Sequence, residues 1–229
     1  MFKVHTEQTA PEASRPILQK VRSNYGMVPN LHGVLAGSPG ALEAYVALSQ
    51  ALGNTGLSPA EQQVVLLAVS VENGCTYCVA AHSTVAKGGK LFDDATLKAL
   101  REGQALPDAR LEALRSFTTT VVRERGFAGD AAVSEFLAAG FTPAHILGVV
   151  TGVALKTLSN YTNHLVDPPL DAVFAARAWT PERQGALSTE ERRRGTTLRA
   201  EWFRPRAAAS IIVPPKTVTR RRLWLICGI

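Results

Sequence analysis

Three residues that can do redox chemistry lie close together in the middle of the chain: Cys75, Cys78 and His82. If this stretch is helical, a rotation of about 100° per residue puts all three within an arc of about 60° on one helix face. Two sulfurs spaced three residues apart can close a disulfide, and an imidazole four residues after Cys78 can take its proton. The spacing therefore predicts a redox site.

The reactive form of such a cysteine is the thiolate, and a free thiol with a pKa of about 8.5 is only slightly ionised at neutral pH. The sequence offers two means of lowering that pKa: the partial positive charge at a helix N-terminus, and His82 as the proton acceptor of Cys78. A thiolate that attacks a peroxide becomes a sulfenic acid, and the other cysteine can condense with it to form a disulfide. We therefore expect Cys75 and Cys78 to support a complete peroxidase cycle.

The same residues allow two other interpretations. Many zinc sites also begin with two cysteines at this spacing, with His82 as a possible third ligand. No second Cys or His pair follows at the usual interval, however, and three ligands on one helical face crowd a tetrahedral metal, so we predict no metal. The remaining alternative is a pair of buried structural cysteines beside a surface histidine.

The elements that must position this site are predicted to be helices almost throughout. Ser58-Pro59 offers a cap followed by a first-turn proline, and Glu61 stands at the capping-box position. The run from Val64 to Val71 is apolar nearly all round, which is typical of a central buried helix, and Asn73-Gly74 ends it just before Cys75. No segment alternates with period two, so the predicted fold class is all-α. The expected helices cover residues 16–25, 32–35, 39–52, 59–71, 75–87, 93–102, 107–125, 130–139 and 143–164.

Length and charge set the domain organisation. With 229 residues, 46% hydrophobic and 19% charged, the chain can bury one good core. Its net charge of +6 is uneven, because residues 1–184 carry 15 basic and 16 acidic side chains, whereas residues 185–229 carry 10 and 3. We therefore predict one helical domain over 1–184 and a basic, poorly ordered extension over 185–229. The extension has neither aromatic interleaving nor an amphipathic period, so no nucleic acid or membrane partner is predicted.

The cysteine content and the first residues favour a cytoplasmic protein. Three cysteines, with Cys227 at the far end of the chain, cannot build a disulfide scaffold, and this usage is typical of a reducing compartment. The N-terminal residues lack the apolar segment of a signal peptide, and no run is long enough for a membrane helix.

In these residues the chain resembles the alkylhydroperoxidase D-like proteins of the carboxymuconolactone decarboxylase superfamily, in their peroxidase-related branch. The resemblance covers roughly residues 10–182. The matching stretches are Tyr25 to Asn30, Glu61 to Leu67, Asn73 to Ser83 and Asn160 to His164. It implies an all-helical protein that forms homo-oligomers, uses no haem or flavin, and reduces hydroperoxides with electrons from a thiol or protein reductant.

The resemblance also implies roles for individual residues. Cys78 would be the activated thiol, His82 its proton acceptor and Cys75 its disulfide partner. Where the family usually has a glutamate on the preceding helix, this chain has Gln63, which can orient an imidazole but cannot hold a proton. Glu72 is the nearest substitute carboxylate, although taken alone it reads as a solvated charge at a helix end.

Three further polar residues, Asn160, Asn163 and His164, follow helical spacing and share a face. They either line a pocket near the thiols or form hydrogen bonds across a helix interface, and we favour the second role. Besides a thiol peroxidase, the sequence leaves open a lyase of the carboxymuconolactone decarboxylase type and a catalytically quiet oligomeric protein.

Overall fold

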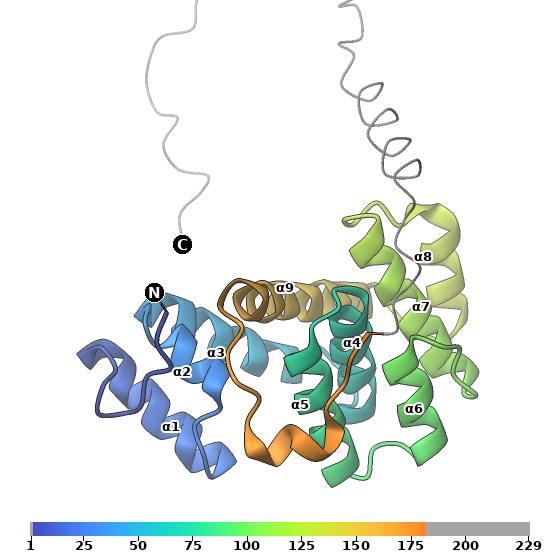
Figure 1. Cartoon of the computed structure of the whole chain (residues 1–229). Helices are drawn as coiled ribbons and strands as arrows, with labels where there is room; N and C mark the ends of the chain where they lie inside the picture. Colours follow the sequence, from blue (N-terminus) through green and yellow to red (C-terminus); the bar gives the residue numbers. More distant parts are fainter. Residues whose placement is uncertain (1, 182–229) are drawn as a thin grey trace, which may run out of the picture. The chain divides into compact units, whose positions relative to one another are not determined.

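The computed structural model describes residues 2–181, and these residues form helices with no strand between them, which confirms the predicted all-α class (Figure 1). The proposed boundary at residue 184 and the extension over 185–229 lie outside the described residues. The α-helices are α1 (Arg15–Tyr25), α2 (Asn30–Leu35), α3 (Pro39–Gly53), α4 (Pro59–Glu72), α5 (Thr76–Gly88), α6 (Asp94–Glu102), α7 (Ala109–Arg123), α8 (Gly129–Ala138) and α9 (Pro143–Val166). Two 3₁₀ helices, η1 (Glu12–Ser14) and η2 (Ala172–Arg177), lie near the ends of the described chain.

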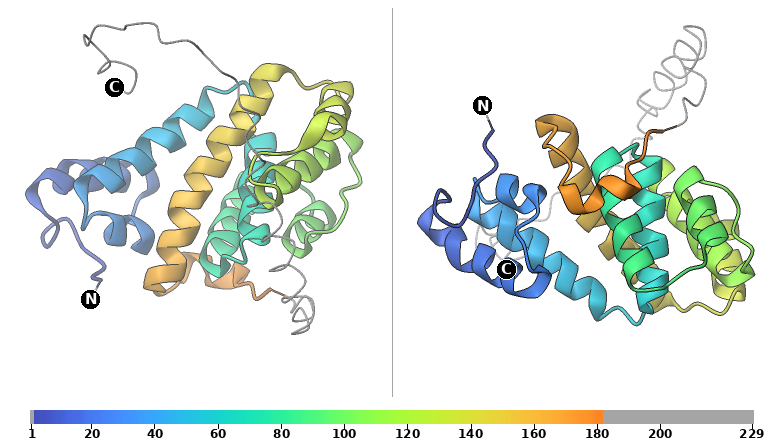
Figure 2. Two further views of the ribbon diagram at one scale, coloured as in Figure 1. Left: turned by 90° about the horizontal axis from the view of Figure 1, so that it is seen from above. Right: turned by 60° about the horizontal axis from the view of Figure 1, so that its bottom comes forward.

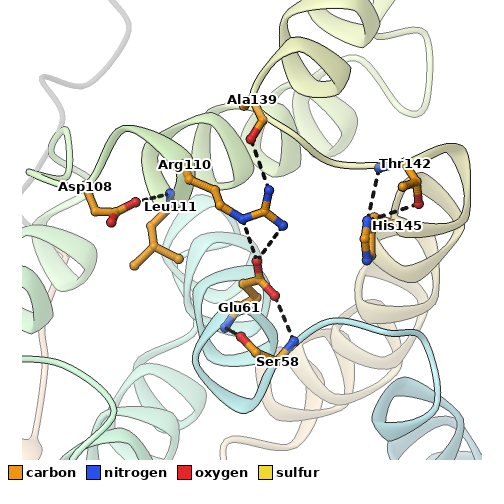
Figure 3. A network of polar contacts seen from close by, with 8 residues as sticks. All are labelled: Ser58, Glu61, Asp108, Arg110, Leu111, Ala139, Thr142 and His145. Atoms are coloured by element: carbon orange, nitrogen blue, oxygen red, sulfur yellow. Dashed lines mark hydrogen bonds and ion pairs between the residues drawn. The ribbon is translucent and has the colours of Figure 1, made fainter.

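The start of α4 is fixed by the predicted capping box and by a cation from another helix (Figure 3). The backbone N–H of Ser58 donates to Glu61 Oε2 at 2.8 Å, and the N–H of Glu61 donates back to Ser58 Oγ at 3.2 Å. The guanidinium of Arg110 on α7 donates from Nε to Glu61 Oε1 at 3.1 Å, and it also lies over the ring of Phe141. Glu61 is therefore a buried structural carboxylate at the far end of α4 from the cysteines.

Helix α4 is the centre of the fold, as its all-round apolar sequence predicted. Every residue from Val64 to Ser70 is buried, and the helix packs against α5, α7 and α9. Helix α9 runs between the N-terminal helices α1–α3 and the helices α4–α8 (Figure 2, left). Gly152 permits its close approach to α4, because a Cβ there would stand only 2.5 Å from Val65 Cγ1.

A tight turn between α4 and α5 places the first cysteine at a helix N-terminus. Gly74 has a φ of +66°, a backbone conformation that favours glycine, and the N–H of Cys75 then donates to the carbonyl of Ser70 at 2.9 Å. Cys75 becomes the N-cap residue of α5, and Cys78 lies in the first turn. The local sequence thus determines where both sulfurs enter the fold.

The segment after α9 returns across α5 and closes this end of the molecule (Figure 2, right). Asp171, which precedes η2, accepts hydrogen bonds from the Tyr77 hydroxyl and from the backbone N–H of Asn30. Arg101 on α6 donates from Nη1 to the carbonyl of Arg177 at 3.0 Å. These contacts bind η2 to α2, α5 and α6, so that η2 lies against the helix that carries the cysteines.

Among residues 2–181, no individual helix has the length and apolar composition to cross a membrane; α8 and α9 meet those criteria only as a pair, with a bend of 114° between them.

Candidate active site

Cys75 and Cys78 are both reduced and almost completely buried, with 1% and 2% of their surfaces exposed. The side-chain amide of Asn163 on α9 lies against both sulfurs: its Nδ2 is 3.6 Å from Cys75 Sγ and 3.2 Å from Cys78 Sγ. The hydroxyl of Ser159, one turn earlier on α9, is 3.9 Å from Cys78 Sγ. The two thiols therefore lie at the interface between α5 and α9, with hydrogen-bonding groups concentrated on Cys78.

The electrostatic environment separates the two thiols. A hydrogen bond from the Cys75 thiol, the positive charge of Lys156 and the Ser159 hydroxyl lower the pKa of Cys78 well below its usual range, although burial opposes them. Because Cys75 donates its proton in this hydrogen bond, the same contact, together with burial, raises the pKa of Cys75. Both shifts favour the thiolate at Cys78 and the thiol at Cys75.

His82 lies on the same helix face as the cysteines, and both ring nitrogens have partners. Its Nδ1 is 3.0 Å from Gln63 Oε1, and its Nε2 is 3.0 Å from Lys156 Nζ. Burial and the charge of Lys156 lower the pKa of His82 well below 6.5, so the imidazole is neutral. Since an amide oxygen only accepts and an ammonium only donates, Nδ1 carries the proton and Nε2 accepts from Lys156.

The structure brings Gln63, His82, Cys75 and Cys78 together in one region, but it places Glu72 elsewhere. The carboxylate of Glu72 accepts a hydrogen bond from Arg123 Nε at 2.8 Å, an ion pair between the C-terminal ends of α4 and α7. Glu72, the predicted substitute for the missing glutamate, is therefore paired with Arg123 and makes no contact with His82.

Two residues of α9, Lys156 and Asn163, belong to the site although the sequence argument did not assign them to it. The sequence favours a structural role for Asn163 and gives Lys156 no role. The sequence did contain a signal for Lys156. At spacings of three and four residues, it shares a helix face with Gly152, Ser159 and Asn163, and a lysine is unexpected on a face of small and apolar residues. A lysine on such a face is buried here with 0% of its surface exposed.

The neighbouring polar residues of α9 divide between structural and surface roles. Asn160 accepts a hydrogen bond from Asn73 Nδ2 at 3.0 Å, so it joins α9 to the turn before Cys75, which is a structural role across a helix interface. His164 is exposed and borders a cavity of about 610 Å³. Other walls of this cavity are Cys75, Asn163 and Trp179, so Cys75 is the cysteine that borders it.

The donor set of the site does not favour a metal ion. Within residues 2–181, no three or more His, Cys, Asp or Glu side chains are grouped so that they could hold a metal ion. His82 directs Nε2 to an ammonium and Nδ1 to an amide oxygen, so the third ligand of the zinc alternative is engaged with other groups.

Comparison with known proteins gives a family match over part of the chain and a shared fold. Residues 39–119, which contain Gln63, both cysteines and His82, match the model of the carboxymuconolactone decarboxylase family. A comparison with curated proteins found no match.

Several solved structures share the fold. A peroxidase-related protein from Ralstonia eutropha JMP134, described as an alkylhydroperoxidase AhpD core, is 23% identical with a TM-score of 0.69, over 79% of this chain and 97% of that one. A peroxidase-related protein from Silicibacter sp. TM1040 is 22% identical with a TM-score of 0.65, over 73% and 89% of the two chains. A cysteine-to-alanine variant of the debrominase Bmp8 in complex with 2,3,4-tribromopyrrole is 15% identical with a TM-score of 0.65, over 77% and 95%.

Proposed function

We propose that this chain is a thiol peroxidase of the alkylhydroperoxidase D-like group of the carboxymuconolactone decarboxylase superfamily, and that it reduces hydroperoxides through a disulfide between Cys75 and Cys78. The observation that carries the proposal is the unequal pair of adjacent reduced cysteines. Cys78 accepts a hydrogen bond from the Asn163 amide at 3.2 Å, and the charge of Lys156 lowers its pKa, whereas burial and the hydrogen bond to Cys78 raise the pKa of Cys75, which borders the cavity.

The peroxide step uses Cys78 as the nucleophile. Its thiolate attacks the terminal oxygen of the hydroperoxide, the O–O bond breaks, and the alkoxide leaves and takes up a proton to become an alcohol. Cys78 is then a sulfenic acid. The Cys75 sulfur attacks the Cys78 sulfur, and the displaced hydroxide leaves as water with the proton that Cys75 carried. One peroxide is thereby reduced for each disulfide formed.

The reductive step begins at the other cysteine. A thiol of a small molecule or of a partner protein enters the cavity and attacks Cys75, and Cys78 leaves as the thiolate. This direction is favoured because a sulfur with a low pKa is the better leaving group in thiol–disulfide exchange. The cycle needs two thiol equivalents per turnover, which a reducing cytoplasm supplies.

Self-association is part of the proposal. Helix α9 exposes the apolar side chains of Leu147, Val150, Tyr161 and Leu165. Their spacing follows one face of the helix, and an exposed apolar stripe of this kind is typical of an interaction surface. A homo-oligomer would bury this stripe, and Leu147→Asp should lower the molar mass measured by light scattering.

The decisive experiment counts thiols. Addition of hydrogen peroxide or cumene hydroperoxide to the reduced protein should consume two thiols per chain, and a dithiol should restore both. Cys78→Ser should abolish peroxide consumption, whereas Cys75→Ser should give one sulfenic acid that does not turn over. Equal activity of the two variants would contradict the assigned roles. Because Cys227 is also a thiol, all proteins should carry Cys227→Ser.

The alternatives give different results in the same experiment. A lyase of the carboxymuconolactone decarboxylase type would turn over a lactone, and this activity would survive Cys78→Ser. A catalytically quiet protein would consume neither substrate, and its thiols would react with peroxide no faster than free cysteine.

A further inference from the structure

Lys156 is a charged side chain in an unusual position for a soluble protein. None of its surface is exposed, although an ammonium group is costly to bury unless an anion and hydrogen-bond acceptors surround it. It lies on α9 one turn before Ser159 and two turns before Asn163, the residues that approach Cys78. The lysine therefore enters the site from the same helix that contacts both sulfurs.

Among the described neighbours of Lys156, the Cys78 thiolate is the anion that can balance its charge. Its Nζ donates to His82 Nε2 at 3.0 Å, but the imidazole is neutral and does not neutralise the ammonium. Within residues 2–181, no carboxylate forms an ion pair with Lys156. Cys78 precedes His82 by one turn of α5, so its sulfur lies on the helix face that Lys156 approaches, and the positive charge of Lys156 lowers the pKa of the thiol.

We propose that Lys156 is the counter-ion that holds Cys78 as a thiolate and the group that gives a proton to the anion leaving in the peroxide step. This inference rests on the proposed function for its second half only. The arrangement of neutral His82 supports it, because an imidazole that accepts from Lys156 positions the ammonium and is not free to take a proton from Cys78.

Protons balance over the whole cycle. In the resting reduced protein, Lys156 is an ammonium, Cys78 a thiolate and Cys75 a thiol. When the O–O bond breaks, the alkoxide takes one proton from Lys156 and becomes an alcohol. Disulfide closure then removes the Cys75 proton as part of water. Reduction by two thiols returns two protons, one to Cys75 and one to Lys156, and Cys78 is released as the thiolate.

The surroundings fit a lysine that changes its charge with the redox state. When the disulfide forms, the thiolate disappears, and a neutral amine then avoids an uncompensated charge in the core. The other titratable groups near the pair keep their protonation. Burial is the main cause that raises the pKa values of Tyr45 and Tyr77, so both phenols stay neutral. The groups that face the pair are Cys75, Tyr77 and His82 on α5, Tyr45 on α3, and Asp171 behind Tyr77.

The first test measures the pH dependence of Cys78 alkylation by iodoacetamide in a Cys75→Ser, Cys227→Ser background, where the serine hydroxyl keeps a donor beside Cys78. With Lys156 present, the midpoint should lie below neutral pH. Lys156→Met, which fills the site with an unbranched apolar chain, should lower the rate at pH 6.5 by about tenfold or more and move the midpoint upward. Lys98→Met, at a lysine whose side chain is 73% exposed, should change neither. An unchanged midpoint in folded Lys156→Met would overturn the proposal.

The second test needs no change at Lys156, so it remains informative if Lys156→Met does not fold. Reduced Cys227→Ser protein is oxidised with bis(2-hydroxyethyl) disulfide in weakly buffered solution at pH 7.5, and a pH indicator records proton uptake. The alkylation midpoint of Cys78 with Lys156 intact, measured in the first test, establishes whether Cys78 starts as the thiolate. If it does and Lys156 gives up its proton, disulfide formation should take up no proton from the solvent. Uptake of one proton per disulfide would show that the lysine stays charged and would overturn its role as donor.

Neither test requires peroxide, so the two proposals can fail separately. A low alkylation midpoint that depends on Lys156, in a protein that does not consume hydroperoxides, would support the counter-ion and reject the peroxidase. Peroxide turnover in a protein whose Cys78 alkylation midpoint is unaffected by Lys156→Met would support the peroxidase and reject the counter-ion.

Discussion

Gln63 Oε1 accepts a hydrogen bond from His82 Nδ1 at 3.0 Å, which fixes the tautomer of a neutral imidazole and directs its other nitrogen to Lys156. The amide thus serves as an orienting group where a family resemblance led us to look for a carboxylate. An orienting role and a proton-holding role give different results when the residue is changed.

Gln63→Leu should therefore weaken both the fold and the site. It leaves the Nδ1 proton of His82 buried without an acceptor, which costs about 1–3 kcal/mol of unfolding free energy. The freed imidazole no longer fixes Lys156, so alkylation of Cys78 at pH 6.5 should slow several-fold. Chemical denaturation and the alkylation rate measure the two effects.

Gln63→Glu is the matched variant, because it keeps an acceptor for His82 and should retain stability better than Gln63→Leu. If a carboxylate is what the site lacks, this variant should consume peroxide faster than the wild type, since glutamate can hold a proton. A lower rate would indicate instead that a second buried anion competes with Cys78 for Lys156.

Asn163 should matter to the thiols, whereas its neighbour Asn160 should matter only to stability. Asn163→Ala removes a donor that lies 3.2 Å from Cys78 Sγ, and hydrogen bonds to charged groups are worth about 1.5–3 kcal/mol. The alkylation midpoint of Cys78 should rise by about one pH unit or more. Asn160→Ala breaks the bond to Asn73 and leaves the midpoint unchanged. Equal midpoints in the two variants would mean that Asn163 does not stabilise the thiolate.

Replacing the two glutamates of α4 should lower the free energy of unfolding by different amounts. Glu61→Ala removes a buried carboxylate that accepts from the Ser58 N–H and from Arg110, and the loss of the capping box and of the ion pair together should cost about 2–4 kcal/mol. Glu72→Ala breaks a partly exposed pair with Arg123 and should cost less than about 1 kcal/mol. Neither should alter thiol alkylation. A slower reaction in Glu72→Ala would restore Glu72 as the proton acceptor that the sequence suggested.

His32 should make the protein sensitive to acid. Burial lowers its pKa from 6.5 to about 4, so between these values the unfolded chain binds a proton that the folded chain does not. Stability therefore falls as the pH drops from 6.5 towards 4, by on the order of 3 kcal/mol from this residue.

His32→Phe keeps an aromatic ring against Tyr45 and removes a buried Nδ1 that has no partner among the described residues. Denaturation midpoints at pH 7 and pH 4.5 should therefore differ less in the variant than in the wild type. The buried His82 should preserve part of the acid sensitivity, because its pKa is also lowered. His164→Phe, at an exposed histidine, should leave the pH dependence unchanged.

Local sequence determined the helices and the position of the cysteines at a helix start. Capping residues, glycines and apolar periodicity act over a few neighbouring residues, so most helix ends lay within about two residues of the expected ones. Ser58 and Glu61 form the predicted capping box, and Asn73-Gly74 makes the turn that delivers Cys75 to the N-terminus of α5. The placement of Gln63 beside His82 followed from a family resemblance, and the structure brings the two side chains together.

The groups that surround the thiols from distant parts of the sequence are brought there by helix packing. Lys156 lies 74 residues from His82 and Asn163 lies 85 residues from Cys78, and no local pattern links such positions. The same holds for Glu72, which is near Cys75 in sequence but turns to Arg123, 51 residues away. Ionisation of a buried sulfur depends on every charge and dipole within a few ångströms. Cys75 reaches Cys78 through local sequence, whereas helix packing brings Lys156, Ser159 and Asn163 to it.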